Sequence, residues 1–178
     1  METIALFGGS FDPPHIGHKA IVEALDKLDF IDKIVVMPTF LNPFKSQSYA
    51  SSKLRFRWLN EIFDHLKDVE INDYEVTQNR SVTSLESVKH LLQKYRKVYL
   101  VIGADNLASL SNWNNYEELS NLVTFIVASR DNIKIDSNFL KLIVDEKISS
   151  SELRDIMQAS KLPKVCALEI EKHYKENI

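Results

Sequence analysis

Short apolar runs alternate with amphipathic stretches along the whole chain. The runs are rich in Val, Ile and Phe, which is typical of buried strands, and they predict strands at 3–7, 33–37, 69–74, 98–102 and 123–128, with a short sixth at 142–144. Apolar residues at helical spacing predict helices at 17–28, 52–63, 83–92, 116–122, 150–159 and 164–174, and a short one from 105. Residues 39–50, rich in Pro, Asn and Ser, are expected to form a loop.

This order of elements indicates a Rossmann-like, doubly wound α/β fold. Continuous apolar strands separated by helices favour a mostly parallel sheet with helices on both faces, because each connection must cross back over the sheet. Such sheets bind ligands at the carboxyl ends of their strands, where the strand order reverses. We therefore expect the loop after the first strand, the turn at 103–105 and the start of the helix at 150 to converge there.

Composition narrows the class of protein. The 178 residues carry 22 Lys and Arg against 25 Asp and Glu, a net charge of −3, which argues against broad binding of nucleic acid. The length suits a single domain spanning 1–178. We expect a cytoplasmic protein, because no apolar window is long enough for a membrane span, no basic leader precedes the first strand, and the lone Cys166 cannot form an internal disulfide.

The first candidate site is the run from Gly8 to His18, which reads GGSFDPPHIGH. Glycines after a buried strand let another molecule approach the backbone, and a helix start offers N–H groups to phosphate. Candidate contacts are Gly8, Gly9, Ser10 and Phe11. His15 and His18 are three apart, so both imidazoles can donate to one anion and, if protonated, add charge. A metal site without an evident third ligand, or an incidental pair at a helix cap, are the alternatives.

This run resembles the Gly-x-Phe-Asp-Pro-x-His-x-Gly-His signature of the nucleotidyltransferases that share the nucleotide-binding fold of class I aminoacyl-tRNA synthetases. The resemblance implies that His15 and His18 contact ATP phosphates during attack on the α-phosphorus, with pyrophosphate leaving.

The second motif is ISSSELR at 148–154. Ser149 and Ser150 place hydroxyls at a helix start, and Arg154 adds a cation one turn on; a plain helix cap with a surface Arg is the alternative. With the first motif, it looks like the Ile-Ser-Ser-x-x-x-Arg signature of the same superfamily, which lies on the opposite side of the triphosphate.

The third motif begins at Gly103 and contains Asp105 and Trp113. Asp105 can accept from ribose hydroxyls or merely cap the next helix, and Trp113 can stack on a planar ring or close the domain surface. The tract from here to Arg130 resembles nicotinate-nucleotide adenylyltransferases, a likeness that extends from residue 3 to about 157. In that family the Trp matching Trp113 contacts the pyridine ring.

Two loops depart from the family pattern. SVTSLE at 81–86 has Val82 where an aromatic residue is usual, while Thr83 remains available to bond the carboxylate or amide of the pyridine ring. In 41–45, Phe44 replaces the common His, and Lys45 can still bridge phosphates or be a solvated loop residue. We assign Lys53, Arg55 and Arg57 to the solvent side of their helix, and no function to His65, His90 or His173.

The resemblance implies transfer of the adenylyl group of ATP to nicotinate mononucleotide, with Mg²⁺ held mainly by phosphate oxygens and no metal site of the protein's own. A homo-oligomer is possible. The rivals are adenylyl transfer to nicotinamide mononucleotide or phosphopantetheine, and a nucleotide sensor without turnover.

Overall fold

The computed structural model describes residues 2–130 and 132–177 and contains a six-stranded sheet. Its strands are β1 (Thr3–Gly9), β2 (Lys33–Pro38), β3 (Val69–Ile71), β4 (Lys97–Gly103), β5 (Val123–Ala128) and β6 (Leu140–Leu142). The α-helices are α1 (Ile16–Leu25), α2 (Ser52–Phe63), α3 (Tyr74–Thr77), α4 (Ser84–Leu91), α5 (Tyr116–Leu122), α6 (Ser150–Asp155) and α7 (Ala167–Asn177), and two 3₁₀ helices are η1 (Ala104–Asn112) and η2 (Ala159–Lys161).

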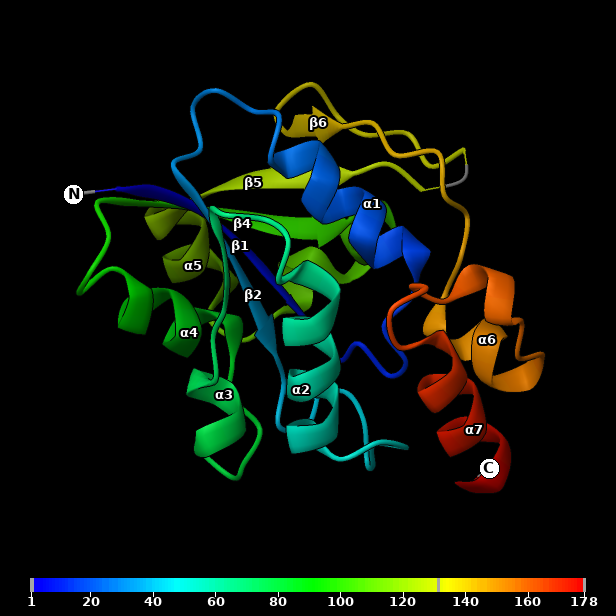
Figure 1. The fold of residues 1–178 in the computed structure, drawn as a ribbon. Helices are drawn as coiled ribbons and strands as arrows, with labels where there is room; N and C mark the ends of the chain where they lie inside the picture. The colour runs from blue at the N-terminus through cyan, green and yellow to red at the C-terminus, as the bar shows by residue number, and fades with distance from the viewer. Residues whose placement is uncertain (1, 131, 178) are drawn as a thin grey trace.

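The strand order is β3-β2-β1-β4-β5-β6, and every neighbouring pair is parallel (Figure 1). The chain starts at the centre, moves outward to β3, and returns to place β4 on the other side of β1. The order therefore reverses between β1 and β4, where doubly wound folds bind their ligands. This arrangement confirms the Rossmann-like prediction.

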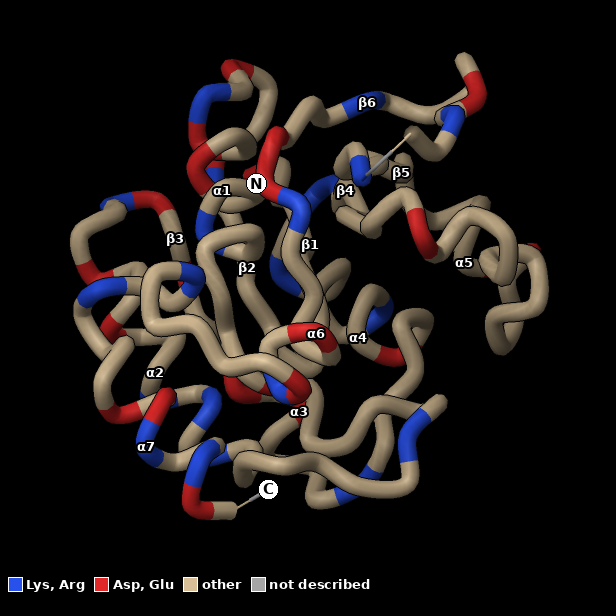
Figure 2. The backbone as a smooth tube through the Cα atoms, turned by 90° about the vertical axis from the view of Figure 1, so that its right-hand side faces the viewer, with Lys and Arg blue, Asp and Glu red and all other residues tan. Residues whose placement is uncertain are grey.

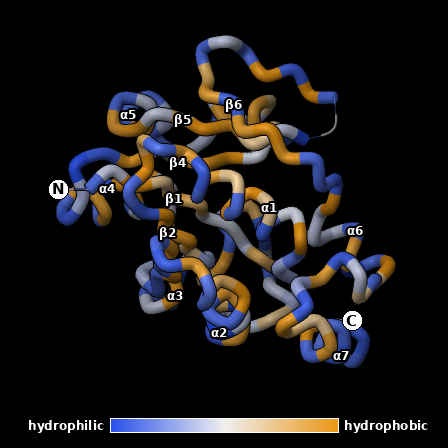
Figure 3. The backbone as a smooth tube through the Cα atoms, turned by 45° about the horizontal axis from the view of Figure 1, so that its top comes forward, coloured by the Kyte–Doolittle hydropathy of each residue, from blue (hydrophilic) through white to orange (hydrophobic). Residues whose placement is uncertain are grey.

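The four strands β1, β2, β4 and β5 send alternate side chains to two separate cores. Ala5 and Phe7 of β1 join a core built with α1, α2, α6 and α7, whereas Ile4 and Leu6 join one built with α4 and α5. Alternation to two apolar layers explains why the strands read as continuous apolar runs. In Figure 3, β2, β4 and β5 carry mostly hydrophobic colours, while α2 and α7 alternate along their length.

Charges of both signs are interspersed along the chain (Figure 2). No helix within the described residues has the length and apolar content to cross a membrane.

Several element boundaries differ from the predictions. The strand expected at 69–74 stops at Ile71. The Asn72 side chain accepts the N–H of Tyr74 (3.0 Å), and α3 begins at Tyr74. The sixth strand lies at Leu140–Leu142, and beyond it the hydroxyl of Ser129 accepts the N–H of Val144 (2.8 Å).

Three helices are also shifted. The first ends at Leu25, and the one expected at 150–159 ends at Asp155, because Ile156 is extended. The last begins at Ala167 and runs to Asn177, after a turn in which Cys166 N–H donates to the Pro163 carbonyl.

Candidate active site

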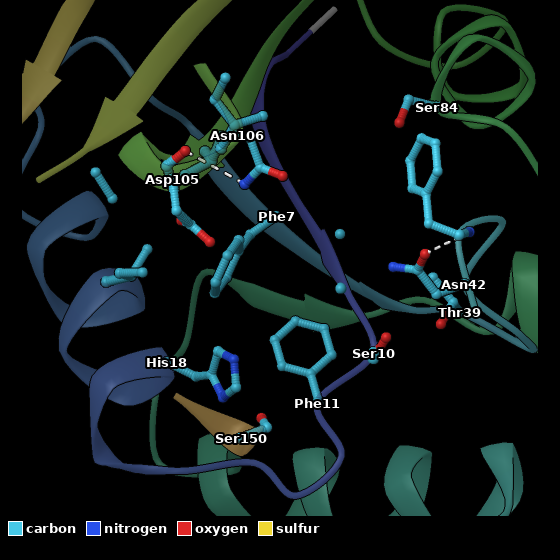
Figure 4. A pocket seen from close by; sticks show the side chains of 18 of the residues that line it. Phe7, Ser10, Phe11, His18, Thr39, Asn42, Ser84, Asp105, Asn106 and Ser150 are labelled. Carbon is cyan, nitrogen blue, oxygen red and sulfur yellow. Dashed lines mark hydrogen bonds between the residues drawn. The ribbon is translucent and has the colours of Figure 1, made fainter. Parts of the chain in front are cut away.

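A cavity of about 650 Å³ opens at the carboxyl ends of β1 and β4. All the residues predicted to form the site line it, except Arg154: Gly8, Gly9, Ser10, Phe11, His15, His18, Lys45, Thr83, Gly103, Asp105, Trp113, Arg130, Ser149 and Ser150. In Figure 4, His18 and Ser150 lie near one another, Thr39, Asn42 and Ser84 lie across the cavity, and Asp105 and Asn106 come from the turn after β4. The three predicted segments therefore converge.

The histidine pair caps the start of α1. His15 Nδ1 accepts from the N–H groups of Gly17 (3.1 Å) and His18 (3.3 Å), and His18 Nδ1 accepts from the N–H of His15 (3.2 Å). This is a reciprocal capping box made by two imidazoles. Because both Nδ1 atoms are acceptors, each neutral ring carries its proton on Nε2. Each ring thus keeps one N–H donor for a ligand.

Burial keeps these rings neutral. The rings stack at 3.6 Å between centroids, and Phe11 packs edge-on to His18 at 4.8 Å. Burial lowers the pKa of His15 to about 3, and the charge of Arg130 acts in the same direction. Burial also lowers the pKa of His18 well below its usual value, aided by His15 and Arg130. At neutral pH the pair therefore supplies hydrogen-bond donors, and the fixed cations must come from elsewhere.

Gly17 lies tightly against the His15 ring. A Cβ at Gly17 would lie 3.0 Å from Cε1 and Nδ1 of the His15 ring. An alanine there would require the His15 ring to shift by a few tenths of an ångström, so the glycine between the two histidines allows their close geometry.

The turn before the histidines is unusual. Phe11 has a positive φ of 49°, which is rare for a bulky residue, and it is almost fully buried. This conformation places its ring against Phe7 and His18, with centroids 5.3 and 4.8 Å away.

The start of α6 is tied to this turn. Ser150 donates its hydroxyl to the carbonyl of Pro13 (2.9 Å), and Ser149 forms a capping box with Glu152. Both serine hydroxyls are therefore engaged within the protein. A ligand at the start of α6 would be bound by backbone N–H groups.

Arg154 lies beside the cavity and does not line it. Its guanidinium donates to the main-chain carbonyl of Asp12, bonds Ser151 Oγ (3.1 Å), and sits 4.5 Å from the ring centroid of Tyr49. Its charge reaches Lys45: burial lowers the pKa of Lys45, and Arg154 lowers it further. Both cations therefore contribute positive potential near the same wall.

The turn after β4 holds an ion pair. Asp105 Oδ2 lies 3.3 Å from Nη1 of Arg130, and Asp105 does not cap η1, because Gly103 occupies that position. A Cβ on Gly103 would lie 2.4 Å from Asp105 Oδ1, so the glycine leaves room for this carboxylate to fold back over the turn. The capping alternative for Asp105 is thereby wrong.

Trp113 and Thr83 line the cavity while also serving the fold. Trp113 ends η1 and packs against the second core. Thr83 caps α4 in a capping box with Glu86, and its hydroxyl lies 3.2 Å from Glu86 Oε1. The Thr83 hydroxyl is thus already occupied by the helix cap.

Two buried polar atoms in cavity-lining residues have no hydrogen-bond partner among the described residues: Oγ1 of Thr39 and Oε2 of Glu75. Burial raises the pKa of Glu75 to about 7, and its other oxygen accepts from Ser87 Oγ (2.6 Å). Neither residue belongs to a motif, so no sequence pattern indicated them.

The assignment of Arg55 to solvent is wrong. Its side chain is fully buried, and its guanidinium donates to the carbonyls of Ala50, Thr39 and Phe40 (3.0, 2.8 and 3.1 Å) and to that of Ser10. Helical spacing could have revealed this, because Arg55 lies three and four positions from the buried Trp58 and Leu59. Arg57 is about half exposed, as predicted.

The model of the cytidylyltransferase-like family matches residues 6–156. A "probable nicotinate-nucleotide adenylyltransferase" of Sulfurimonas denitrificans is 65% identical over 176 residues, covering 99% of this chain and 97% of the relative. One of Campylobacter jejuni is 48% identical, covering 97% of each.

Solved structures agree in fold. The Plasmodium falciparum nicotinic acid mononucleotide adenylyltransferase complexed with NaAD superposes with a TM-score of 0.79 at 22% identity, covering 100% of this chain and 97% of that one. The same enzyme complexed with APC gives 0.74 at 21% identity, with coverage of 100% and 97%. By its relatives and its motifs, the chain belongs to the nicotinate-nucleotide adenylyltransferase family, within the cytidylyltransferase-like nucleotidyltransferases.

Proposed function

We propose that the protein transfers the adenylyl group of ATP to nicotinate mononucleotide, giving nicotinate adenine dinucleotide and pyrophosphate for NAD biosynthesis. The observation that carries this proposal is the 65% identity to a family member across 99% of the chain. The structural neighbour complexed with NaAD, the dinucleotide product, supports it.

In this reaction the 5′-phosphate of the mononucleotide attacks the α-phosphorus of ATP, a new P–O–P linkage forms, and the bond to pyrophosphate breaks. The attacking oxygen is already anionic, so no protein nucleophile or general base is required. Catalysis rests on alignment and on stabilising the charge that builds on the phosphates.

The histidine pair supplies that stabilisation through neutral donors. The Nε2–H groups of His15 and His18 would bond the α-phosphate and the leaving pyrophosphate as negative charge develops there. The backbone of Gly8, Gly9 and Ser10 would let the nucleotide approach β1, next to the ring of Phe11.

Cations and helix N–H groups complete the phosphate site. Lys45 and Arg130 line the cavity and would pair with phosphate oxygens, while Arg154 would act through its potential and through its support of Asp12. The start of α6, at Ser149 and Ser150, would donate from its backbone. Mg²⁺ would enter with ATP, held mainly by phosphate oxygens and water.

The turn after β4, Trp113 and the loop before α4 would hold the nucleosides. Gly103 lets the Asp105 carboxylate fold over the turn, where it would accept from a ribose hydroxyl, and Trp113 would lie against the pyridine ring. Because the Thr83 hydroxyl is engaged with Glu86, Thr83 would contact the nicotinate carboxylate only if that engagement loosens.

We propose, further, that residues 1–178 act as one domain in the cytoplasm and can associate as a homo-oligomer.

Pyrophosphate release tests the function. The protein is incubated with ATP, Mg²⁺ and one acceptor at a time: nicotinate mononucleotide, nicotinamide mononucleotide or phosphopantetheine. Release is expected chiefly with nicotinate mononucleotide. Preferential release with another acceptor would support a rival transferase, and ATP binding without release under any acceptor would support the sensor.

A further inference from the structure

The C-terminal helix reaches the catalytic motif through one buried hydrogen bond. Tyr174 of α7 donates its hydroxyl to Oδ1 of Asp12, which lies three residues before His15. The two residues are 2% and 1% exposed. The match to the family model ends at residue 156, so α7 lies wholly outside it. In Figure 1, α6 and α7 lie together at one end of the molecule.

The Asp12 carboxylate is a junction of three segments. Besides Tyr174, it accepts the N–H groups of Tyr49 (2.8 Å) and Ala50 (2.9 Å), at the end of the 39–50 loop. Its main-chain carbonyl accepts from Arg154. One side chain therefore joins the turn before the histidines, the loop that carries Lys45, and the C-terminal helix.

The 39–50 loop is also held at both ends by Arg55, so the Asp12 carboxylate affects where the loop places Lys45. Arg55 holds its start through the carbonyls of Thr39 and Phe40 and its end through that of Ala50. Lys45 lies between these two anchors and lines the cavity. The position of Lys45 relative to His15 and His18 thus depends on how firmly Asp12 is fixed.

We propose that Asp12 and Tyr174 are positioning residues of the adenylyl-transfer site, and that their hydrogen bond makes α7 part of the catalytic unit. The inference rests on the proposed function. Burial and the adjacent Asp12 charge raise the pKa of Tyr174, so its hydroxyl keeps its proton and remains a donor. Without that donor, the buried carboxylate has one partner fewer, and the loop and turn that it joins are less well aligned.

The test compares Tyr174→Phe with Tyr95→Phe. Tyr95 is a matched control, because it is also 2% exposed and also donates to a carboxylate, that of Glu70 (3.2 Å). It lies just before β4, at the end of the sheet opposite the cavity. We expect Tyr174→Phe to lower kcat/KM for ATP about tenfold or more and to raise KM for ATP, because small misplacements of reacting groups are costly. Tyr95→Phe should leave both constants within about twofold of wild type.

Urea denaturation of both variants shows that the assays compare folded proteins. Equal kinetics in the two variants would overturn the proposal. Should Tyr174→Phe not fold, amide hydrogen exchange of the wild type with and without a nonhydrolysable ATP analogue and Mg²⁺ answers the same question. Slower exchange in α7 on binding supports the coupling, and unchanged exchange there contradicts it.

Failure of the proposed function is distinguishable from failure of this inference. The first is a wild type that releases no pyrophosphate with nicotinate mononucleotide. The second is a wild type that turns over normally while Tyr174→Phe behaves like Tyr95→Phe.

Discussion

Replacing Arg55 by Met tests whether the buried guanidinium holds the fold around the site. Met has a similar length and cannot donate hydrogen bonds. The substitution removes four bonds to main-chain carbonyls, two of them fully buried, those of Ala50 and Thr39. The carbonyls of Ser10 and Phe40 are only partly buried, so water can replace the guanidinium there.

The expected loss follows from these contacts. Leaving a buried acceptor without a partner costs about 1–3 kcal/mol, so two such acceptors cost roughly 2–6 kcal/mol. Removing a buried cation returns part of its desolvation penalty, which places the net loss at about 3 kcal/mol. This is a large share of the total stability of about 5–15 kcal/mol that is usual for a domain.

The assay is urea denaturation of Arg55→Met beside Arg57→Met. Arg57 lies on the same helix, is about half exposed, and pairs with Glu61 (3.0 Å) and with Glu169. Exposed ion pairs contribute about 0–1 kcal/mol, so the control should lose little. Equal losses in the two variants would refute the reasoning.

Three further perturbations follow from the site. The imidazole NMR signals of His15 and His18 should not titrate between about pH 6 and 8, since burial lowers the pKa of both histidines; a titration of either ring near pH 6.5 would contradict neutral imidazoles. Burial raises the pKa of Glu75 from an ordinary 4.5 to about 7. The neutral acid therefore adds to the free energy of unfolding below pH 4.5, and this contribution is lost as the pH rises through 7. Glu75→Gln should therefore gain roughly 3 kcal/mol over wild type at about pH 8 relative to about pH 4, and denaturation at both values measures it; a pH-independent difference would count against the raised pKa. Gly17→Ala should lower kcat about tenfold or more in a folded protein, because the new Cβ meets the His15 ring, and unchanged kcat would show that the ring geometry is not needed.

The sequence predicted what depends on local pattern. Apolar runs gave the strands, and motifs gave the segments that meet at the cavity. The end of the third strand was predicted wrongly, because the side chain of Asn72 forms a local hydrogen bond that starts α3 and competes with the strand.

Contacts between distant segments could not be predicted in this way. Asp12 and Tyr174 are 162 positions apart, and nothing in either neighbourhood indicates the other. The burial of Arg55, by contrast, could have been predicted, because its helical spacing from Trp58 and Leu59 places it on the buried side of α2. Its assignment to solvent followed from its positive charge alone.

The most direct test of the account is dinucleotide formation by wild type and His18→Ala, with circular dichroism and denaturation confirming that both are folded. Wild type, given ATP, Mg²⁺ and nicotinate mononucleotide, should form nicotinate adenine dinucleotide and pyrophosphate in equal amounts. His18→Ala should lose about a hundredfold or more of that rate, as expected for a donor to developing phosphate charge. A folded His18→Ala that forms dinucleotide at the wild-type rate would contradict the central claim.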